Sequence, residues 1–278
     1  MHPLPLRKLL LGELSWKRLV RSLLFIYTCT GLYVFFRADS MIFLPQPASY
    51  QDTNDILKLP VTATEQISAI YLSNPQAAYT VLYIHGNAED LGDVRPFLHR
   101  LHSWKFSVFA YDYRGYGTSD GHPSERNAYH DADAAYLYLT QHLNIPAQQI
   151  IVYGRSVGGG SAVELASRHP VAGLILESTF TSAFRVVIPF PMFPFDKFAN
   201  LDKLPNVDCP VLIMHGQADQ TIPIQHAQAL YQAAPEPKMS LWVAGLDHNL
   251  TLLDDESYQK TLTTFQRLVE KHPVARRP

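Results

Sequence analysis

Short apolar runs alternate with longer amphipathic segments along most of the chain. Runs rich in β-branched and aromatic residues predict strands at 66–72, 80–84, 107–113, 149–153, 172–176, 210–214 and 239–243. Helical spacing of apolar residues predicts helices at 90–104, 124–143, 157–169, 224–234 and 256–271. Most strand runs are apolar throughout, which is typical of a parallel sheet covered on both faces. The alternation predicts an α/β fold with a mostly parallel central sheet and helices on both faces.

One segment, residues 179–204, breaks this alternation. It contains six phenylalanines and three prolines, and prolines at this density exclude a long helix or a central strand. We expect a short apolar lid, because long loops in compact domains are commonly functional. The alternative is a connection whose aromatic side chains only cover the core.

Composition and charge narrow the classes of protein. The 278 residues are 47% hydrophobic, which is enough for a large core, and we expect one domain over 41–272. Lys and Arg number 23 against 25 Asp and Glu, a net charge of -2. No basic field is present to attract a phosphate backbone, so nucleic acid is not an expected partner.

The N-terminal region contains an uncharged stretch at 22–36. As a helix it covers about 22 Å, short of the ~30 Å hydrocarbon core unless Leu19 and Val20 extend it. Basic residues are concentrated before it, so the positive-inside rule predicts a basic cytoplasmic segment at 1–21 and a single-pass signal anchor at 22–36. The catalytic domain would then lie on the non-cytoplasmic side. A cleaved signal peptide and a helix lying in the membrane interface are the alternatives.

A candidate nucleophile follows the predicted strand at 149–153. Residues 154–158 read Gly-Arg-Ser-Val-Gly, which is G-x-S-x-G between a strand and a helix. In that context the turn presents the Ser156 hydroxyl above the sheet and places the Val157 N–H at the start of the helix. No G-x-x-x-x-G-K-[ST] or G-x-G-x-x-G pattern is present, so a phosphate-binding loop is not expected here.

A serine nucleophile needs a base, and the base needs an orienting acid. Asp219 follows the predicted strand at 210–214 and His248 follows the one at 239–243, in the order serine, acid, histidine. The carboxyl ends of parallel strands meet at one edge of the sheet, where active sites of this architecture lie. We interpret Asp247 as a turn residue, because adjacent loop side chains rarely orient one another.

The loop after the strand at 80–84 is the expected second half of an oxyanion hole. It contains Gly86, which allows close backbone approach, and Asn87. We expect the N–H groups of Asn87 and Val157 to hold the oxyanion. His85 and His215 occupy matching His-Gly positions at strand ends and are expected to brace loops. No metal or other cofactor is expected, because no histidine pair has metal-ligand spacing beside a carboxylate on one helix.

Five motifs together carry a resemblance to a known family. They are His-Gly-Asn-Ala-Glu-Asp at 85–90, Asp-Tyr-Arg-Gly-Tyr-Gly at 112–117, Gly-Arg-Ser-Val-Gly at 154–158, His-Gly-Gln-Ala-Asp at 215–219 and Gly-Leu-Asp-His at 245–248. The chain resembles the α/β-hydrolase superfamily, and most closely its membrane-anchored serine hydrolases with a minimal lid, which include protein depalmitoylases.

The resemblance implies the α/β-hydrolase fold, with Ser156 as nucleophile, His248 as base and Asp219 as acid. It also implies a strand at 41–45 leading into the domain, and a loop shaped by Arg114 and Gly115. Eukaryotic depalmitoylases of this branch carry an N-terminal cysteine cluster, whereas this chain has a lone cysteine, Cys29, in its N-terminal apolar run.

The function predicted from the sequence is a serine hydrolase that cleaves a carboxylic ester or thioester through an acyl-enzyme. An apolar lid and a nearby membrane anchor favour a lipid-acyl substrate. A small-ester esterase or a peptidase of the same fold remains an alternative, as does a non-catalytic, membrane-tethered interaction protein.

Overall fold

The computed structural model describes residues 15–274. The chain divides into two compact units, Met1–Ala38 and Asp39–Pro278. Most of the predicted cytoplasmic segment 1–21 lies outside the described residues, and its last residues belong to a helix.

That helix is α2 (Trp16–Ile42), which has 27 residues and is therefore about 40 Å long. It extends beyond the predicted stretch 22–36 at both ends. Its mean hydropathy reaches 1.6, and within residues 15–274 it is the one helix long and apolar enough to cross a membrane. A signal sequence meets the same criterion.

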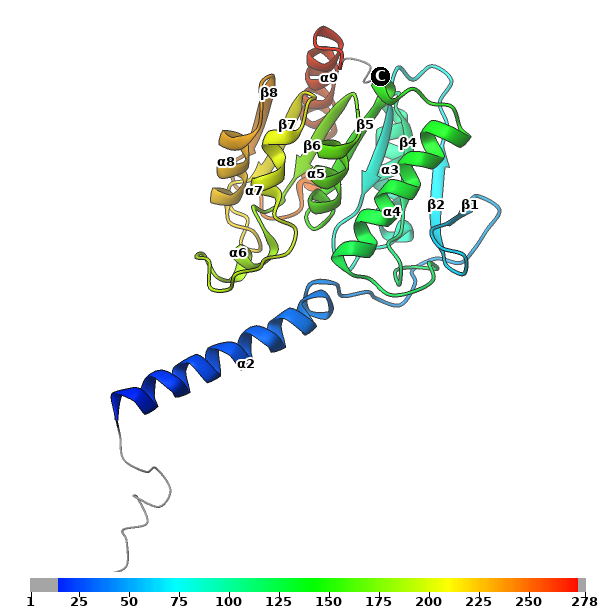
Figure 1. Cartoon of the computed structure of the whole chain (residues 1–278). Helices are drawn as coiled ribbons and strands as arrows, with labels where there is room; N and C mark the ends of the chain where they lie inside the picture. Colours follow the sequence, from blue (N-terminus) through cyan, green and yellow to red (C-terminus); the bar gives the residue numbers. More distant parts are fainter. Residues whose placement is uncertain (1–14, 275–278) are drawn as a thin grey trace, which may run out of the picture. The chain divides into compact units, whose positions relative to one another are not determined.

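The second unit is built on an eight-stranded sheet in the order β1-β2-β4-β3-β5-β6-β7-β8. The pairs β1–β2 and β2–β4 are antiparallel, and the other neighbours are parallel (Figure 1). The strands are β1 (Ile56–Pro60), β2 (Gln66–Leu72), β3 (Thr80–Ile84), β4 (Ser107–Tyr111), β5 (Ile150–Arg155), β6 (Gly173–Glu177), β7 (Val211–Gly216) and β8 (Lys238–Val243).

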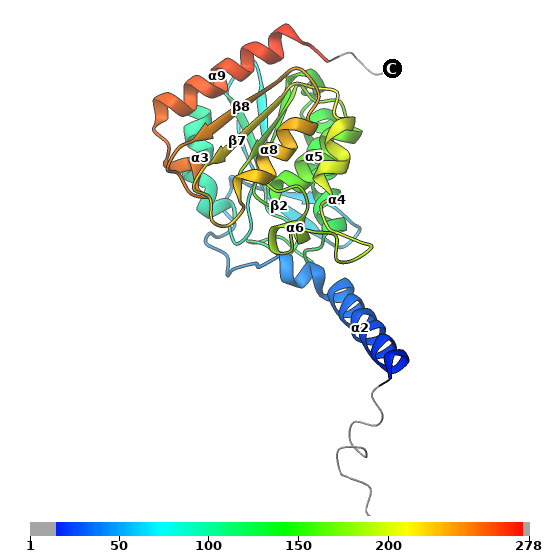
Figure 2. The same ribbon diagram turned by 90° about the vertical axis from the view of Figure 1, so that its left-hand side faces the viewer.

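Helices cover both faces of the sheet. The α-helices of this unit are α3 (Leu91–Ser103), α4 (Glu125–Leu137), α5 (Gly158–Arg168), α6 (Ala183–Val187), α7 (Asn200–Lys203), α8 (Ile224–Ala233) and α9 (Asp255–Lys271). Shorter turns are the π-helix η1 (Tyr138–His142) and the 3-10 helices η2 (Ala147–Gln149), η3 (Leu204–Asn206) and η4 (Leu250–Leu252). Helices α3 and α9 pack on one face, and α4, α5 and α8 on the other (Figure 2).

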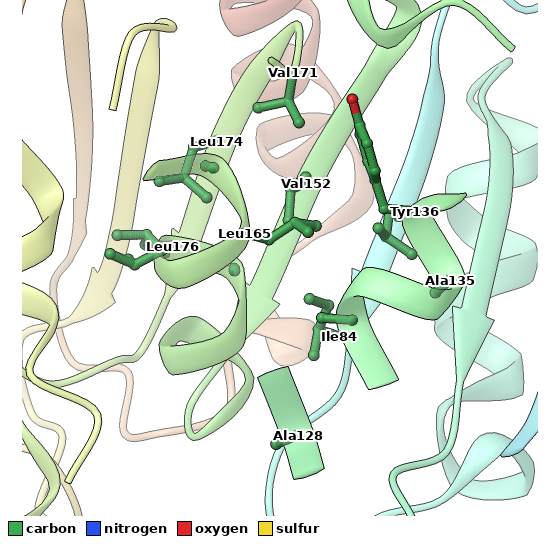
Figure 3. Close-up of a cluster of buried hydrophobic side chains, with 14 of the residues drawn as sticks. Ile84, Ala128, Ala135, Tyr136, Val152, Leu165, Val171, Leu174 and Leu176 are labelled. Atoms are coloured by element: carbon green, nitrogen blue, oxygen red, sulfur yellow. The ribbon is translucent and has the colours of Figure 1, made fainter. Parts of the chain in front are cut away.

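The core consists of two apolar layers, one on each face of the sheet. Figure 3 shows part of the layer beneath α4 and α5, where Ala128 and Leu165 from the helices face Ile84, Val152 and Leu176 from the strands. The central strands are buried along their whole length. Burial on both faces explains why these strands are apolar without alternation, and the predicted α/β-hydrolase sheet with helices on both faces is confirmed.

All seven strands and five long helices expected from the hydrophobic pattern are present, with shifted ends, and β1 is an additional strand. The further strand at 41–45, which the resemblance implies, is wrong. Met41 and Ile42 end helix α2, and the Phe43 N–H continues the helical pattern by donating to the Asp39 carbonyl. The Leu44 N–H then donates to side chains, Asn87 Oδ1 and the Tyr116 hydroxyl, rather than to a neighbouring strand.

The segment 179–204 forms a loop whose two ends are joined at its base. The Leu201 N–H donates to the Thr181 carbonyl, and the Asn200 side-chain amide donates to the Phe180 carbonyl. Phe180 and Phe198 are buried in the core. The middle of the loop is exposed: Val187, Phe190 and Met192 are 82%, 56% and 41% exposed. The ends of the segment therefore cover the core, and its middle presents an apolar surface.

Candidate active site

Four strand ends contribute the predicted site residues. Asn87 follows β3, Ser156 follows β5, Asp219 follows β7 and His248 follows β8. All four strands run parallel in the sheet, so their carboxyl ends lie at one edge. The structure brings Ser156, Asp219 and His248 into one chain of hydrogen bonds at this edge.

Ser156 occupies a sharp turn between β5 and α5. Its φ is +52°, a left-handed conformation that is unfavourable for residues other than glycine. The conformation is held by two contacts with the neighbouring β6 connection: the Ser156 N–H donates to the Glu177 carbonyl, and the Thr179 hydroxyl donates to the Ser156 carbonyl. A Cβ on Gly154 would lie 2.6 Å from the Ala162 Cβ, so the turn can pass this close to α5 only with glycine there.

His248 links the serine to the aspartate. Its Nε2 lies 3.1 Å from Ser156 Oγ, and its Nδ1 lies 2.8 Å from Asp219 Oδ2. The Asp219 side chain is fully buried, whereas that of His248 is 22% exposed. If Nδ1 carries the proton and donates to Asp219, Nε2 is left as an acceptor facing the serine hydroxyl, which is the arrangement that general-base catalysis requires.

The environment of Asp219 favours its charged form. Burial alone would raise the pKa of this carboxyl, but hydrogen bonds from His215, His248 and the Ile222 N–H outweigh it and hold the pKa well below its ordinary value. The Thr221 N–H also donates to Oδ1, at 2.9 Å. Asp219 therefore stays ionised and acts as a fixed acceptor for His248.

The β3 loop brings its backbone beside the serine. A Cβ on Gly86 would lie 3.5 Å from Ser156 Cβ, and the loop ends at Asp90, which caps α3 by accepting from the Gly92 and Asp93 N–H groups. Within residues 15–274, neither the Asn87 N–H nor the Val157 N–H donates a hydrogen bond. Both backbone donors therefore have no hydrogen-bond acceptor among the described residues.

The Asn87 side chain has a different role from its backbone. Its amide donates to the Ile42 carbonyl at 2.6 Å, and its oxygen accepts from the Leu44 N–H and the Tyr116 hydroxyl. It fixes the chain that enters the domain, so only the backbone of Asn87 can serve an oxyanion.

Three residues near the site brace loops. Asp247 Oδ1 accepts from the N–H groups of Gln220 and His248, so it is a turn residue as expected. His85 Nδ1 lies 2.7 Å from the Gly86 carbonyl oxygen. His215 Nε2 lies 2.8 Å from the Ile222 carbonyl oxygen and 3.2 Å from Asp219 Oδ2, directly behind the acid.

A buried charged group beside the serine was not identified from the sequence. Arg155 contacts Glu89 and Asn249, which lie in two different loops, and Glu177 at the end of β6. The one sequence feature that could have drawn attention to Arg155 is its position inside the G-x-S-x-G motif. Its three partners are distant in the sequence and therefore give no local pattern. Among residues 15–274, no cluster of three or more His, Cys, Asp or Glu side chains is arranged to hold a metal ion.

Comparisons with known proteins agree with this fold. The model of the serine aminopeptidase S33 family matches residues 75–199. The esterase Pf2001 of Pyrococcus furiosus superposes with a TM-score of 0.68 at 17% identity, covering 81% of this chain and 100% of that one. Est1E of Butyrivibrio proteoclasticus, solved with ferulic acid, has a TM-score of 0.64 at 17% identity over 76% of this chain and 99% of its own.

Sequence relatives define the family. Alpha/beta hydrolase domain-containing protein 17B of Xenopus tropicalis is 41% identical over 204 residues, and the human protein of that name is 40% identical over the same length. Each match covers 72% of this chain and 69% of the relative. The chain belongs to the α/β-hydrolase superfamily, as the motifs indicated. Within that superfamily it is similar to the alpha/beta hydrolase domain-containing 17 proteins. Its membership of the superfamily makes it a hydrolase.

Proposed function

We propose that the protein is a serine hydrolase that cleaves a carboxylic ester or thioester through an acyl-enzyme. The observation that carries this proposal is the continuous hydrogen-bonded chain from Ser156 Oγ through His248 to the buried carboxylate of Asp219. The N–H groups of Asn87 and Val157, which have no acceptor among the described residues, support it. In this mechanism no cofactor is required.

The reaction proceeds in two halves. His248 Nε2 takes the Ser156 proton while Oγ attacks the carbonyl carbon, and the N–H groups of Asn87 and Val157 hold the oxyanion. His248 then donates that proton to the leaving alcohol or thiol. Water, deprotonated by His248, hydrolyses the acyl-serine and restores the free hydroxyl. Asp219 remains ionised throughout and stabilises the imidazolium form of His248.

The substrate we propose is a long acyl chain esterified to a lipid or protein. The segment 179–204 supports this class, because residues 186–195 carry no charge. They line a hollow of about 330 Å³ together with the charged side chains of Arg185, Asp196 and Asp202. Phe193 and Phe195 stack at 5.4 Å between their ring centroids on this surface. A small soluble ester would need no such surface.

A peptidase acting on a free amine is the second candidate, favoured by the name of the matching family model. The segment 179–204 has two acidic residues. Asp196 already accepts from the Ser182 hydroxyl and from the N–H groups of Phe184 and Lys197, whereas Asp202 is exposed. One exposed carboxylate supports recognition of a substrate amine less well than the uncharged stretch 186–195 supports binding of an acyl chain.

We also propose that α2 is an uncleaved, single-pass signal anchor with the hydrolase domain on the non-cytoplasmic side. The length and hydropathy of the helix support a membrane span, and Lys17, Arg18 and Arg21 at its start support a cytoplasmic N-terminus. Alkaline extraction of membranes, with protease protection of a C-terminal tag, tests this. Release by alkali would instead indicate a cleaved signal peptide or an interfacial helix.

The test of the activity is labelling by a fluorophosphonate probe, with Ser156→Ala as control. We expect labelling of the wild type and none of the variant. Hydrolysis of p-nitrophenyl esters from acetate to palmitate then distinguishes a long-acyl enzyme from a small-ester esterase by the chain-length optimum. No labelling of a folded wild type in detergent or in lipid would refute the catalytic proposal and favour a tethered interaction protein.

A further inference from the structure

We propose that Arg155 is a positioning residue that holds two loops in register with the nucleophile. These are the loop after β3 at 85–90, here called the oxyanion loop, and the loop after β8 at 244–249, here called the histidine loop. This inference rests on the proposed serine-hydrolase function. Arg155 precedes Ser156 directly, and its side chain is only 10% exposed. Its guanidinium contacts the loop after β3, the loop after β8 and the last residue of β6.

The first contact reaches the oxyanion loop. Arg155 Nη1 pairs with one oxygen of Glu89, and the other oxygen of that carboxylate accepts from the Gly86 N–H at 3.1 Å. A Cβ on Gly86 would lie 2.9 Å from this carboxylate, so the loop is closed tightly around it. Ala88 takes up a left-handed φ of +56° to make this closure. The path of the backbone through Asn87 therefore depends on where Arg155 holds Glu89.

The second contact reaches the histidine loop. Arg155 Nη2 donates to Asn249 Oδ1 at 3.3 Å. Asn249 follows His248 directly, and the same oxygen accepts from the Thr251 N–H and hydroxyl at the start of η4. One guanidinium thus links the residue after the base to the loop that carries an oxyanion donor.

The third contact is an ion pair with the last residue of β6. Arg155 Nε lies 3.5 Å from Oε1 of Glu177, which is fully buried. The other oxygen of Glu177 accepts from the Tyr153 and Tyr258 hydroxyls. Since three separate nitrogens of Arg155 face three partners, a lysine ammonium, which is a single point charge, cannot reproduce the arrangement.

The test compares Arg155→Lys with Arg114→Lys. Arg114 is 4% exposed and pairs through its side chain with Asp131 and Glu65, away from the site, so it provides a matched loss of a buried guanidinium. We expect Arg155→Lys to lower kcat about 10-fold to 100-fold, because small displacements of catalytic groups have effects of this size. KM should change by less than about twofold, since only interactions made in the transition state are affected. Arg114→Lys should lower the Tm and leave kcat within about twofold.

A trifluoromethyl ketone, which forms a tetrahedral adduct with an active serine, provides a second readout. Its Ki should rise in Arg155→Lys by the same factor by which kcat/KM falls. If Arg155→Lys does not fold, Glu89→Gln replaces it, because glutamine keeps an acceptor for the Gly86 N–H but loses the charge that pairs with Arg155. It should show the same fall in kcat at constant KM.

Two results would overturn the positioning role. One is a kcat for Arg155→Lys equal to that of Arg114→Lys at a similar Tm, and the other is a raised KM with unchanged kcat. A wild type that neither labels with fluorophosphonate nor hydrolyses any p-nitrophenyl ester would overturn the proposed function and this role with it. A labelling, active wild type with an unaffected Arg155→Lys variant would overturn only the role of Arg155.

Discussion

Replacing Asp219 by asparagine tests the orienting acid with little change in shape. Oδ1 of Asp219 accepts from the Thr221 and Ile222 N–H groups at 2.9 and 2.8 Å, while Oδ2 faces His248 Nδ1 at 2.8 Å. Two backbone donors fix the amide oxygen of the asparagine on the loop side, because a peptide N–H cannot change its role. The new amide NH2 then faces His248 Nδ1. Because the NH2 group can only donate, Nδ1 must become the acceptor.

The histidine must respond by changing its tautomer. With Nδ1 as acceptor, the proton of neutral His248 moves to Nε2, which lies 3.1 Å from Ser156 Oγ. That nitrogen can no longer accept the serine proton. Losses of about 10³-fold to 10⁴-fold in kcat accompany such a tautomer error in serine hydrolases, equivalent to about 4–5.5 kcal/mol at 1.36 kcal/mol per factor of ten.

The assay is steady-state hydrolysis of the preferred p-nitrophenyl ester, with Asp247→Asn as the matched control. Asp247 is adjacent to His248, and its Oδ1 accepts from two backbone N–H groups that an asparagine oxygen also satisfies. We expect Asp247→Asn to stay within about threefold of the wild type in kcat. The reverse pattern, an active Asp219→Asn and an inactive Asp247→Asn, would refute the assignment of the acid.

Three further predictions follow from packing, charge and exposure. Gly154→Ala should lower the free energy of unfolding by about 1–3 kcal/mol in denaturant titrations, because the new methyl would lie 2.6 Å from the Ala162 Cβ. Since the pKa of Asp219 is lower in the folded state than its unfolded value near 3.9, the unfolded state binds more protons below that pH. Wild-type stability should therefore fall more steeply than that of Asp219→Asn as the pH falls from about 5 to 3. Val187→Ser with Phe190→Ser should lower palmitate-ester hydrolysis about fivefold to thirtyfold and leave acetate hydrolysis unchanged, since both side chains are exposed and two lost apolar contacts are worth about 1–2 kcal/mol.

The sequence predicts the central sheet well, because burial on both faces leaves a direct signature in the strands. It does not reveal β1 (Ile56–Pro60), whose alternating pattern is short and ends in a proline at the edge of the sheet. The strand at 41–45 is implied by the family resemblance and not by the hydrophobic pattern of this chain. Phe43 is buried, but its burial comes from aromatic neighbours rather than from sheet pairing. A resemblance in sequence does not distinguish these two causes.

The positions of the candidate site residues are predictable because each follows a strand that the pattern identifies. The position of Ser156 between β5 and α5 depends on a local turn, and its motif is contiguous. The links of Arg155 are not local: Asn249 is 94 residues away and Glu89 is 66 residues away. Such contacts exist only after the two loops have been brought to Arg155 by the fold, so no spacing rule can find them.

The joined base of the segment 179–204 has a consequence for how this fold can diversify. The Thr181–Leu201 and Phe180–Asn200 hydrogen bonds close the loop below its exposed part, and the Thr179 hydroxyl, just before them, holds the Ser156 carbonyl. Phe198 lies between these ends but is buried in the core, so the part that can vary is the exposed stretch around Val187, Phe190 and Met192. We expect insertions, deletions or substitutions in that stretch to leave the backbone support of Ser156 in place.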